Sequence, residues 1–147
     1  MSLKQKVIAI DGPSASGKGT VASRVAEALG FLYLDSGALY RLTALYAQKQ
    51  NVTWSDEDAV STLAETLPAQ FEGSAVLLNG EDVSEQIRTE AIGMGASAVA
   101  QLPKVRAALL QRQRDFLTDK GLVADGRDIG SVIFPDAALK IFLTASA

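Results

Sequence analysis

The sequence contains no cysteine and no histidine among its 147 residues. Without cysteine there is no disulfide framework and no thiolate metal site, a composition that suits the cytosol. Without histidine, the Ser-His and Cys-His nucleophile systems and the usual imidazole zinc ligands are excluded. No apolar run approaches the ~18 residues of a membrane span, and the apolar part of MSLKQKVIAI is too short for a signal peptide. We therefore expect a cytoplasmic protein with no membrane partner.

Excess positive charge is also missing. The net charge is −3 and the sequence pI is about 4.9, so the chain has no basic overall field that would attract nucleic acid. Any site for an anion must therefore be built from local groups. Hydrophobic residues make up 48% of the chain, and this length is enough for one compact domain with a core.

Apolar residues alternate between strand-like and helix-like spacing along the chain. Val7–Ile10 and Phe31–Leu34 are typical of buried strands, and the helical spacing between them, ended by Gly30, predicts a βαβ unit. Ser55 and Asp58 form a predicted capping box for a helix running toward residue 67. Further helices are predicted over about 38–48, 89–101 and 103–118, and further strands over 122–124 and 139–143. The pattern predicts an α/β fold with a parallel sheet and flanking helices.

One stretch, AQFEGSAVLLNGEDV, departs from this alternation. Turn residues divide it into three short apolar runs, and Asn79-Gly80 favours a type I′ hairpin. We therefore expect a small antiparallel meander inserted into the α/β chain.

The loop GPSASGKG follows the first predicted strand and precedes a helix. It fits G-x-x-x-x-G-K, except that Gly19 replaces the usual Ser or Thr and Thr20 comes one residue later. Glycines let backbone amides turn toward a phosphate, the helix N-terminus adds partial positive charge, and Lys18 adds a full charge. A glycine-rich turn without a ligand is the alternative, which the strand–loop–helix order disfavours. The candidate phosphate-binding residues of this loop are Gly12, Pro13, Ser14, Ala15, Ser16, Gly17, Lys18, Gly19 and Thr20.

DSGALYR comes directly after the second predicted strand, where ligands bind in parallel sheets. Asp35 or Ser36 would serve equally well as a plain helix N-cap, and Arg41 as a solvated surface charge. A phosphoryl acceptor needs an anchor, however, and arginine suits that purpose. The candidate acceptor residues here are Asp35, Ser36, Gly37, Tyr40 and Arg41.

LVADGRDIG forms the end of the third predicted strand and the loop after it. Asp125 stands at the end of an apolar run. Proteins with a phosphate loop typically have an acidic residue in this position, and its carboxylate orients Mg²⁺ or the waters bound to the ion. Arg127 and Asp128 follow directly, and a charged surface turn is the alternative for this pair. Thr20 is the other candidate metal residue. Arg106 lies in a predicted helix that carries other arginines, and most such charges only solvate a helix face.

Taken together, GPSASGKGT, DSGALYR and ADGRDIGSVIFPDAALKIFLTAS closely resemble the bacterial cytidylate kinases, which are P-loop nucleoside-monophosphate kinases. The resemblance covers essentially the whole chain, and residues 69–88 look like that family's monophosphate-binding insert. It implies a P-loop NTPase-type sheet of about four strands in the order 2-3-1-4. It also implies in-line transfer of the γ-phosphoryl group from ATP to CMP or dCMP with Mg²⁺, giving ADP and CDP or dCDP.

The resemblance also assigns roles by motif. Gly17, Lys18, Gly19 and Thr20 match the ATP phosphate loop, and Ser36, Tyr40 and Arg41 match the segment that holds the acceptor monophosphate. Ser97, Arg106, Arg127 and Asp128 match residues that recognise the pyrimidine nucleotide. Arg106 thereby becomes an expected ligand, and Lys18, Asp125 and Arg127 are the expected catalytic residues. Asp128 is expected to accept a hydrogen bond from the exocyclic amine of cytosine.

The family continues with further helices, a fifth strand and an arginine-rich lid, so residues 1–147 look like a truncated core. No arginine follows Arg127. We expect the isolated chain to be nearly inactive and the intact protein to be monomeric. We also expect strand 139–143 to be an exposed edge through which the fragment self-associates. Two other interpretations stay open: a non-catalytic nucleotide-binding module, and a P-loop kinase of another acceptor, such as shikimate or a different nucleotide.

Overall fold

The computed structural model describes residues 6–12, 18–72 and 75–143. The chain divides into two compact units, which we call the sheet unit (Met1–Ser36 and Gln113–Ala147) and the helical unit (Gly37–Arg112). The strands are β1 (Val7–Asp11), β2 (Leu32–Asp35), β3 (Ala69–Glu72), β4 (Ala75–Leu78), β5 (Glu81–Asp82), β6 (Leu122–Gly126) and β7 (Leu139–Phe142). The helices are α1 (Lys18–Leu29), α2 (Ser36–Lys49), α3 (Glu57–Glu65), α4 (Glu90–Ala100) and α5 (Pro103–Asp115), with short helical turns η3 (Gln86–Arg88) and η4 (Ile129–Ile133).

The sheet unit is built on four parallel strands in the order β2-β6-β1-β7. Counted along the chain within this sheet alone, β1, β2, β6 and β7 are strands 1 to 4, so the observed order is 2-3-1-4. The predicted α/β fold and the predicted strand order are both confirmed. Asp125 on β6 is in register with Ile10 on β1 and with Asp35 on β2. The carboxyl ends of β2, β6 and β1 therefore lie together at one end of the sheet, and the predicted site residues of the sheet unit, Asp35, Asp125, Arg127 and Asp128, lie at or just after these ends.

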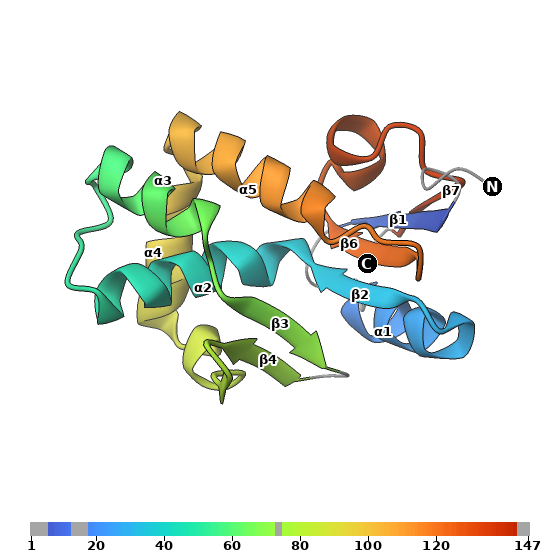
Figure 1. Cartoon of the computed structure of the whole chain (residues 1–147), viewed down its shortest axis with the longest axis horizontal. Coiled ribbons are helices and arrows are strands. Elements are labelled where there is room, and N and C mark those ends of the chain that lie inside the picture. Colours follow the sequence, from blue (N-terminus) through green and yellow to red (C-terminus); the bar gives the residue numbers. More distant parts are fainter. Residues whose placement is uncertain (1–5, 13–17, 73–74, 144–147) are drawn as a thin grey trace, which may run out of the picture. The chain divides into compact units, whose positions relative to one another are not determined.

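The core of the sheet unit lies between the sheet and α1, which runs along one face of the sheet (Figure 1). Ile10 and Val123 pack against Ala22 and Ala26, and all four side chains are buried. The spacing of Ala22 and Ala26 puts both on one side of the helix, which explains why this face of α1 turns inward. Gly30 then ends the helix in the left-handed conformation that glycine adopts without strain.

The two outer strands show where the sequence prediction needs correction. Residues 31–34 were predicted to form a buried strand, but β2 lies at the edge of the sheet and only Leu34 is fully buried in it. β7 is the opposite edge, and Leu139 and Phe142 are 50% and 72% exposed, as the edge prediction requires. Self-association through this edge stays a prediction.

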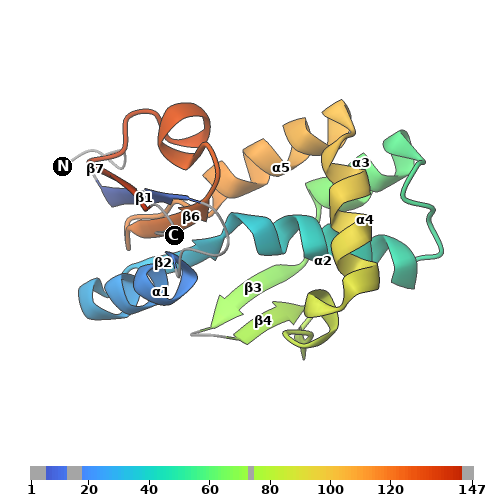
Figure 2. The ribbon, with the colours of Figure 1, turned by 180° about the vertical axis from the view of Figure 1, so that it is seen from behind.

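In the helical unit, Trp54 links two helices. Figure 2 shows α4 crossing α2 in this unit. The indole Nε1 of Trp54 donates a hydrogen bond to the carbonyl oxygen of Ala44 on α2, at 3.0 Å. Its ring lies so close to α4 at Gly95 that a Cβ atom there would be 2.4 Å from Cζ2 of the ring. Glycine at position 95 therefore makes room for the tryptophan.

The predicted antiparallel meander is confirmed as a three-stranded sheet in the order β3-β4-β5, inside the helical unit. Asn79 and Gly80, between β4 and β5, have φ values of 53° and 82°. Positive φ at both central residues is what a type I′ turn requires, so the Asn-Gly signal predicted this turn correctly. The sheet and η3 together fall within the predicted insert at residues 69–88.

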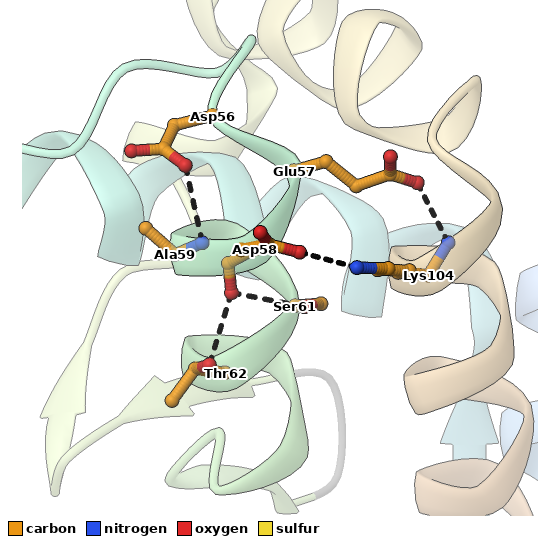
Figure 3. A network of polar contacts seen from close by, with 7 residues as sticks. All are labelled: Asp56, Glu57, Asp58, Ala59, Ser61, Thr62 and Lys104. Carbon is orange, nitrogen blue, oxygen red and sulfur yellow. Dashed lines mark hydrogen bonds and ion pairs between the residues drawn. The ribbon is translucent and has the colours of Figure 1, made fainter.

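The predicted capping box on α3 is wrong by one residue. Asp56, rather than Ser55, caps the helix, because its carboxylate accepts a hydrogen bond from the amide of Ala59 at 3.3 Å (Figure 3). The helix ends at Glu65, two residues before the predicted end, and α5 ends at Asp115 rather than near 118.

A second contact joins α3 to the start of α5. Glu57 accepts a hydrogen bond from the backbone amide of Lys104 at 2.9 Å, and Asp58 pairs with the Lys104 ammonium group at 2.5 Å (Figure 3). The Glu57 carboxylate thus satisfies one of the amides that the beginning of α5 leaves without an intrahelical partner.

No helix within residues 18–72 and 75–143 has both the length and the apolar character needed to span a bilayer. The cytoplasmic location stays a prediction.

Candidate active site

The glycine loop itself lies mostly outside the described residues. Residues 13–17, five of the nine candidate ATP-binding positions, are in this group, and the phosphate-binding role of the loop stays a prediction. The flanking elements are described: Gly12 follows β1, and α1 begins at Lys18. The strand and helix that a phosphate loop must connect are therefore both present in the predicted order, and Thr20 is exposed in the first turn of α1.

Asp125 is a buried carboxylate near the end of β6, with 1% of its surface exposed. The phenol of Tyr33 on β2 donates a hydrogen bond to its Oδ2 atom. Tyr33 and Asp35 are two residues apart, so they lie on the same face of β2, and Asp35 is in register with Asp125. The carboxylates of Asp35 and Asp125 and the phenol of Tyr33 therefore lie on the same face of the sheet, near the carboxyl ends of β2 and β6. Burial raises the pKa of the Tyr33 phenol well above its ordinary value, and the charges of Asp125 and Asp35 raise it further.

Gly19 faces this pair from the first turn of α1. A Cβ atom at position 19 would lie 3.7 Å from the Tyr33 hydroxyl oxygen and 3.9 Å from Oδ2 of Asp125. Asp125 is thus placed beside the segment that closes the glycine loop, and its role toward a metal ion stays a prediction.

The donor set at this edge fits Mg²⁺. Among the described residues, no group of three or more His, Cys, Asp or Glu side chains is arranged to hold a metal ion on its own. Mg²⁺ usually keeps several waters and is bound through one or two carboxylates and the substrate phosphates. A single buried carboxylate at Asp125 is therefore consistent with an ion that is held partly through water.

Asp11, at the end of β1, holds the loop that follows β6. Its Oδ1 atom accepts a hydrogen bond from the amide of Ile129 at 2.7 Å, and its Oδ2 atom accepts one from the amide of Gly130 at 3.0 Å. The amide of Gly12 donates to the carbonyl oxygen of Gly126 at 3.2 Å. The loop between β6 and η4 is therefore tied on both sides to the residues that open the glycine loop.

Arg127 and Asp128 occupy that loop, and both are exposed. Asp128 has a φ of 59°, in the left-handed region that residues other than glycine rarely adopt. Ser36 lies against the same loop, because a Cβ atom at Gly126 would be 2.6 Å from the Cβ atom of Ser36. The sheet unit thus brings together Ser36, Asp125 and the Arg127-Asp128 pair.

The remaining candidates, apart from Asp35 of the sheet unit, belong to the helical unit. Arg41 is not a freely solvated charge, because its Nη1 atom donates to the carbonyl oxygen of Ile87 at 2.9 Å.

Tyr40 and Arg106 interact: burial raises the pKa of the Tyr40 phenol, and the positive charge of Arg106 acts in the opposite direction. Arg106 and Ser97 are both exposed, on α5 and α4. Asp35 ends β2, and Gly37 lies exposed in the first turn of α2.

Comparison with known proteins shows the family of this chain. The sequence model of the family described as cytidylate kinase matches residues 8–147. The chain belongs to the cytidylate kinase family. It is 80% identical over 144 residues to a cytidylate kinase of Neisseria meningitidis, and 78% identical over 144 residues to one of Neisseria gonorrhoeae. It is 64% identical over 141 residues to a cytidylate kinase of Chromobacterium violaceum.

These alignments cover nearly all of the present chain but only part of each related cytidylate kinase. The two Neisseria alignments take in 98% of the chain and 66% of each relative, and the Chromobacterium alignment takes in 96% of the chain and 64% of the relative. The chain therefore spans just under two thirds of the length of the curated relatives it matches.

Sequence reasoning missed two polar residues of this cytidylate kinase family member, Tyr33 and Asp11. The sequence pattern predicts Tyr33 only as part of an apolar strand, and nothing in that pattern indicates a role for its hydroxyl. Asp11 had a usable signal, because an aspartate that ends a buried strand directly before a glycine loop places a carboxylate at the binding edge of the sheet.

Proposed function

We propose that the protein transfers the γ-phosphoryl group of ATP to CMP or dCMP, producing ADP and CDP or dCDP. The observation that carries this proposal is the buried Asp125, held by Tyr33 and facing Gly19 at the start of α1. A carboxylate beside the helix that follows a phosphate loop is the kind of group that orients the metal accompanying ATP, which supports the proposal. The membership of the chain in the cytidylate kinase family supports the choice of acceptor.

On the donor side, the backbone amides of the glycine loop and the ammonium group of Lys18 neutralise charge on the ATP phosphates. Asp125, mostly through water, and Thr20 are the residues that would hold a Mg²⁺ ion bound together with ATP. When bound, Mg²⁺ neutralises the charge that develops on the phosphoryl oxygens. Tyr33 holds the Asp125 carboxylate in one orientation.

On the acceptor side, Arg41, Arg106 and Arg127 bind the monophosphate, because guanidinium groups match phosphate oxygens in a forked geometry. The Asp128 carboxylate accepts a hydrogen bond from the exocyclic amine of cytosine, a donor that uracil lacks. The attacking oxygen belongs to a phosphate and is already anionic, so the reaction proceeds in line with little help from a general base.

The 147-residue chain by itself is expected to turn over slowly. No arginine follows Arg127 in this sequence, so within these residues Lys18 and the metal carry most of the charge at the transferring group. One arginine that reaches the transition state contributes a factor of roughly 10³ to 10⁵ in rate. Binding of nucleotides is therefore expected to survive in this chain better than catalysis.

The experiment is a calorimetric titration of ATP and of CMP, followed by an ADP-release assay with CMP, dCMP, UMP, AMP and shikimate as acceptors. We expect binding of both ATP and CMP, and faster release of ADP with CMP or dCMP than with the other acceptors. A preference for shikimate or another nucleotide would contradict the acceptor assignment. Binding without turnover of any acceptor, in a longer form of the length of the relatives, would favour a non-catalytic nucleotide-binding module.

Two pairs of variants sharpen this test. Lys18→Met should abolish ATP binding, whereas Lys120→Met, which removes an exposed lysine of the same unit, should leave it unchanged. Asp128→Ala should reduce the preference for CMP over UMP without changing ATP affinity. Unchanged discrimination in Asp128→Ala would contradict the role given to its carboxylate.

A further inference from the structure

We propose that Asp11 is a positioning residue, which holds Arg127 and Asp128 in the conformation that binds the acceptor nucleotide. This inference rests on the proposed function, because it takes the acceptor to be bound by those two residues. Asp11 lies on β1, beside the loop that binds the donor, whereas Arg127 and Asp128 come more than one hundred positions later in the chain. One side chain would then connect the donor loop with the acceptor loop.

The first step of the argument is the pair of hydrogen bonds that Asp11 accepts. Each carboxylate oxygen takes one backbone amide, Oδ1 that of Ile129 at 2.7 Å and Oδ2 that of Gly130 at 3.0 Å. Both donor residues are buried, so without the carboxylate their amides would lose their partner away from bulk water. The negative charge also lies at the beginning of η4, where a helical turn presents unpaired amides.

The second step concerns the other end of the loop, at Gly126. The amide of Gly12 donates to the carbonyl oxygen of Gly126 at 3.2 Å, which fixes the residue just before Arg127. Only Arg127 and Asp128 then lie between the two fixed points. Asp128 has a φ of 59°, a backbone conformation that an aspartate keeps only when its surroundings hold it. The Asp11 carboxylate supplies that restraint on the side of Ile129.

The third step distinguishes the contacts of the Asp11 side chain from those of its backbone. Its carbonyl oxygen accepts a hydrogen bond from the amide of Leu143 at 2.8 Å, and its register partners are Gly126 and Phe142. Substitutions of the side chain leave these backbone contacts in place. An asparagine at position 11 keeps one acceptor oxygen of the two, so Asp11→Asn removes half of the restraint with almost no change of volume.

The experiment compares Asp11→Asn and Asp11→Ala with the unmodified chain, using Asp119→Asn as a matched control on an exposed aspartate whose contact with Lys6 runs through its backbone carbonyl. Hydrogen exchange at the amides of Ile129 and Gly130 reports on the loop in the absence of any ligand. Calorimetry then gives the affinities for CMP and for ATP separately. The control should match the unmodified chain in all three measurements.

We expect Asp11→Asn to speed exchange at both amides and to weaken CMP binding about tenfold, the size of one lost charged hydrogen bond. ATP affinity should stay within about threefold. Asp11→Ala should give a larger change of the same kind. In an Asp128→Ala background, where the main recognition contact is already gone, Asp11→Asn should lose most of its effect on CMP.

Equal losses of CMP and ATP affinity would mean that Asp11 only stabilises the fold, which would overturn the inference. Unchanged exchange at Ile129 and Gly130 would overturn it as well, whatever the affinities show. Failure of the unmodified chain to bind CMP would overturn the proposed function and this inference together, and that result is distinguishable because the exchange rates do not depend on any nucleotide.

Discussion

The sheet unit and the helical unit hold their carboxylates in opposite ways. In the sheet unit, Asp125 is buried and Asp11 is half-buried, and their donors lie 92 and 118 positions away in the chain. In the helical unit, Asp56 and Asp58 are exposed and bind at the ends of surface helices (Figure 3). The carboxylates of both units accept hydrogen bonds, but the two sets differ in how easily water could replace the donor.

This difference decides what each contact contributes. A carboxylate that is removed from bulk water replaces a lost donor less readily with water, so the loss of the hydrogen bond costs more free energy there. An exposed carboxylate that loses its partner is rehydrated, so little free energy is lost. We therefore expect the long-range contacts of the sheet unit to fix the candidate site, and the surface contacts of the helical unit to tune the ends of α3 and α5.

The largest effect should come from Tyr33→Phe. The substitution removes the hydroxyl that donates to the buried Asp125, and we expect the free energy of unfolding to fall by about 1–3 kcal/mol. Urea denaturation followed by far-ultraviolet circular dichroism measures it. Tyr46→Phe is the control in the helical unit, since its hydroxyl makes no hydrogen bond among the described residues, and it should change stability by less than about 0.5 kcal/mol. Equal effects of the two variants would break the comparison between the units.

A second prediction tests how closely the Trp54 ring packs against α4 in the helical unit. Gly95→Ala would place a Cβ atom 2.4 Å from the Trp54 ring, so we expect a loss of about 1–3 kcal/mol from overpacking. Gly93→Ala, in the same helix, meets only the Arg41 guanidinium at 3.4 Å and should be neutral or stabilising by up to about 1 kcal/mol. Trp54 is the sole tryptophan of the chain, so its fluorescence reports the displacement directly. The same sign for both variants would contradict the packing described for α4.

The smallest effect concerns Lys104. The hydrogen bond and the charge of Asp58 raise its pKa above 10.5, so the pair stabilises the folded state fully below pH 10.5. That contribution is lost as the pH rises through the raised pKa. Lys104→Met should therefore be slightly less stable than the unmodified chain at pH 8, and the gap should close toward pH 11 and in 1 M salt. Urea titrations at the two pH values measure the gap, and a gap that stays constant would show that the charge of Lys104 has no part in it.

Local signals predicted the elements of the fold well, because they depend on residues that are neighbours in the chain. Asn79-Gly80 and Gly30 each stand where only certain residues fit, and the structure has the predicted turn and helix end at both. The cap of α3 was misplaced because Ser55 and Asp56 are both good capping residues and only the contact with Ala59 distinguishes them. β2 was predicted to be buried because an apolar run does not reveal whether its strand lies at the edge of a sheet.

The candidate site was predictable to the extent that motifs carry it. The placement of Asp125 beside the glycine loop followed from its position at the end of an apolar strand. The contacts that hold it and its neighbours did not, since Tyr33 and Asp11 act across a sheet whose strand order must be known first. Arg41 shows the same limit, because its bond to the Ile87 carbonyl joins two segments that no local pattern connects.

The strand order also has a consequence for synthesis on the ribosome. β1 leaves the exit tunnel before both of its neighbours, β6 and β7, which are encoded after the whole of residues 37–112. Chains fold as they emerge, and pairing across long separations is slow. The apolar residues of β1 therefore stay without their strand partners while the helical unit is made, and during that interval they are open to non-native contacts.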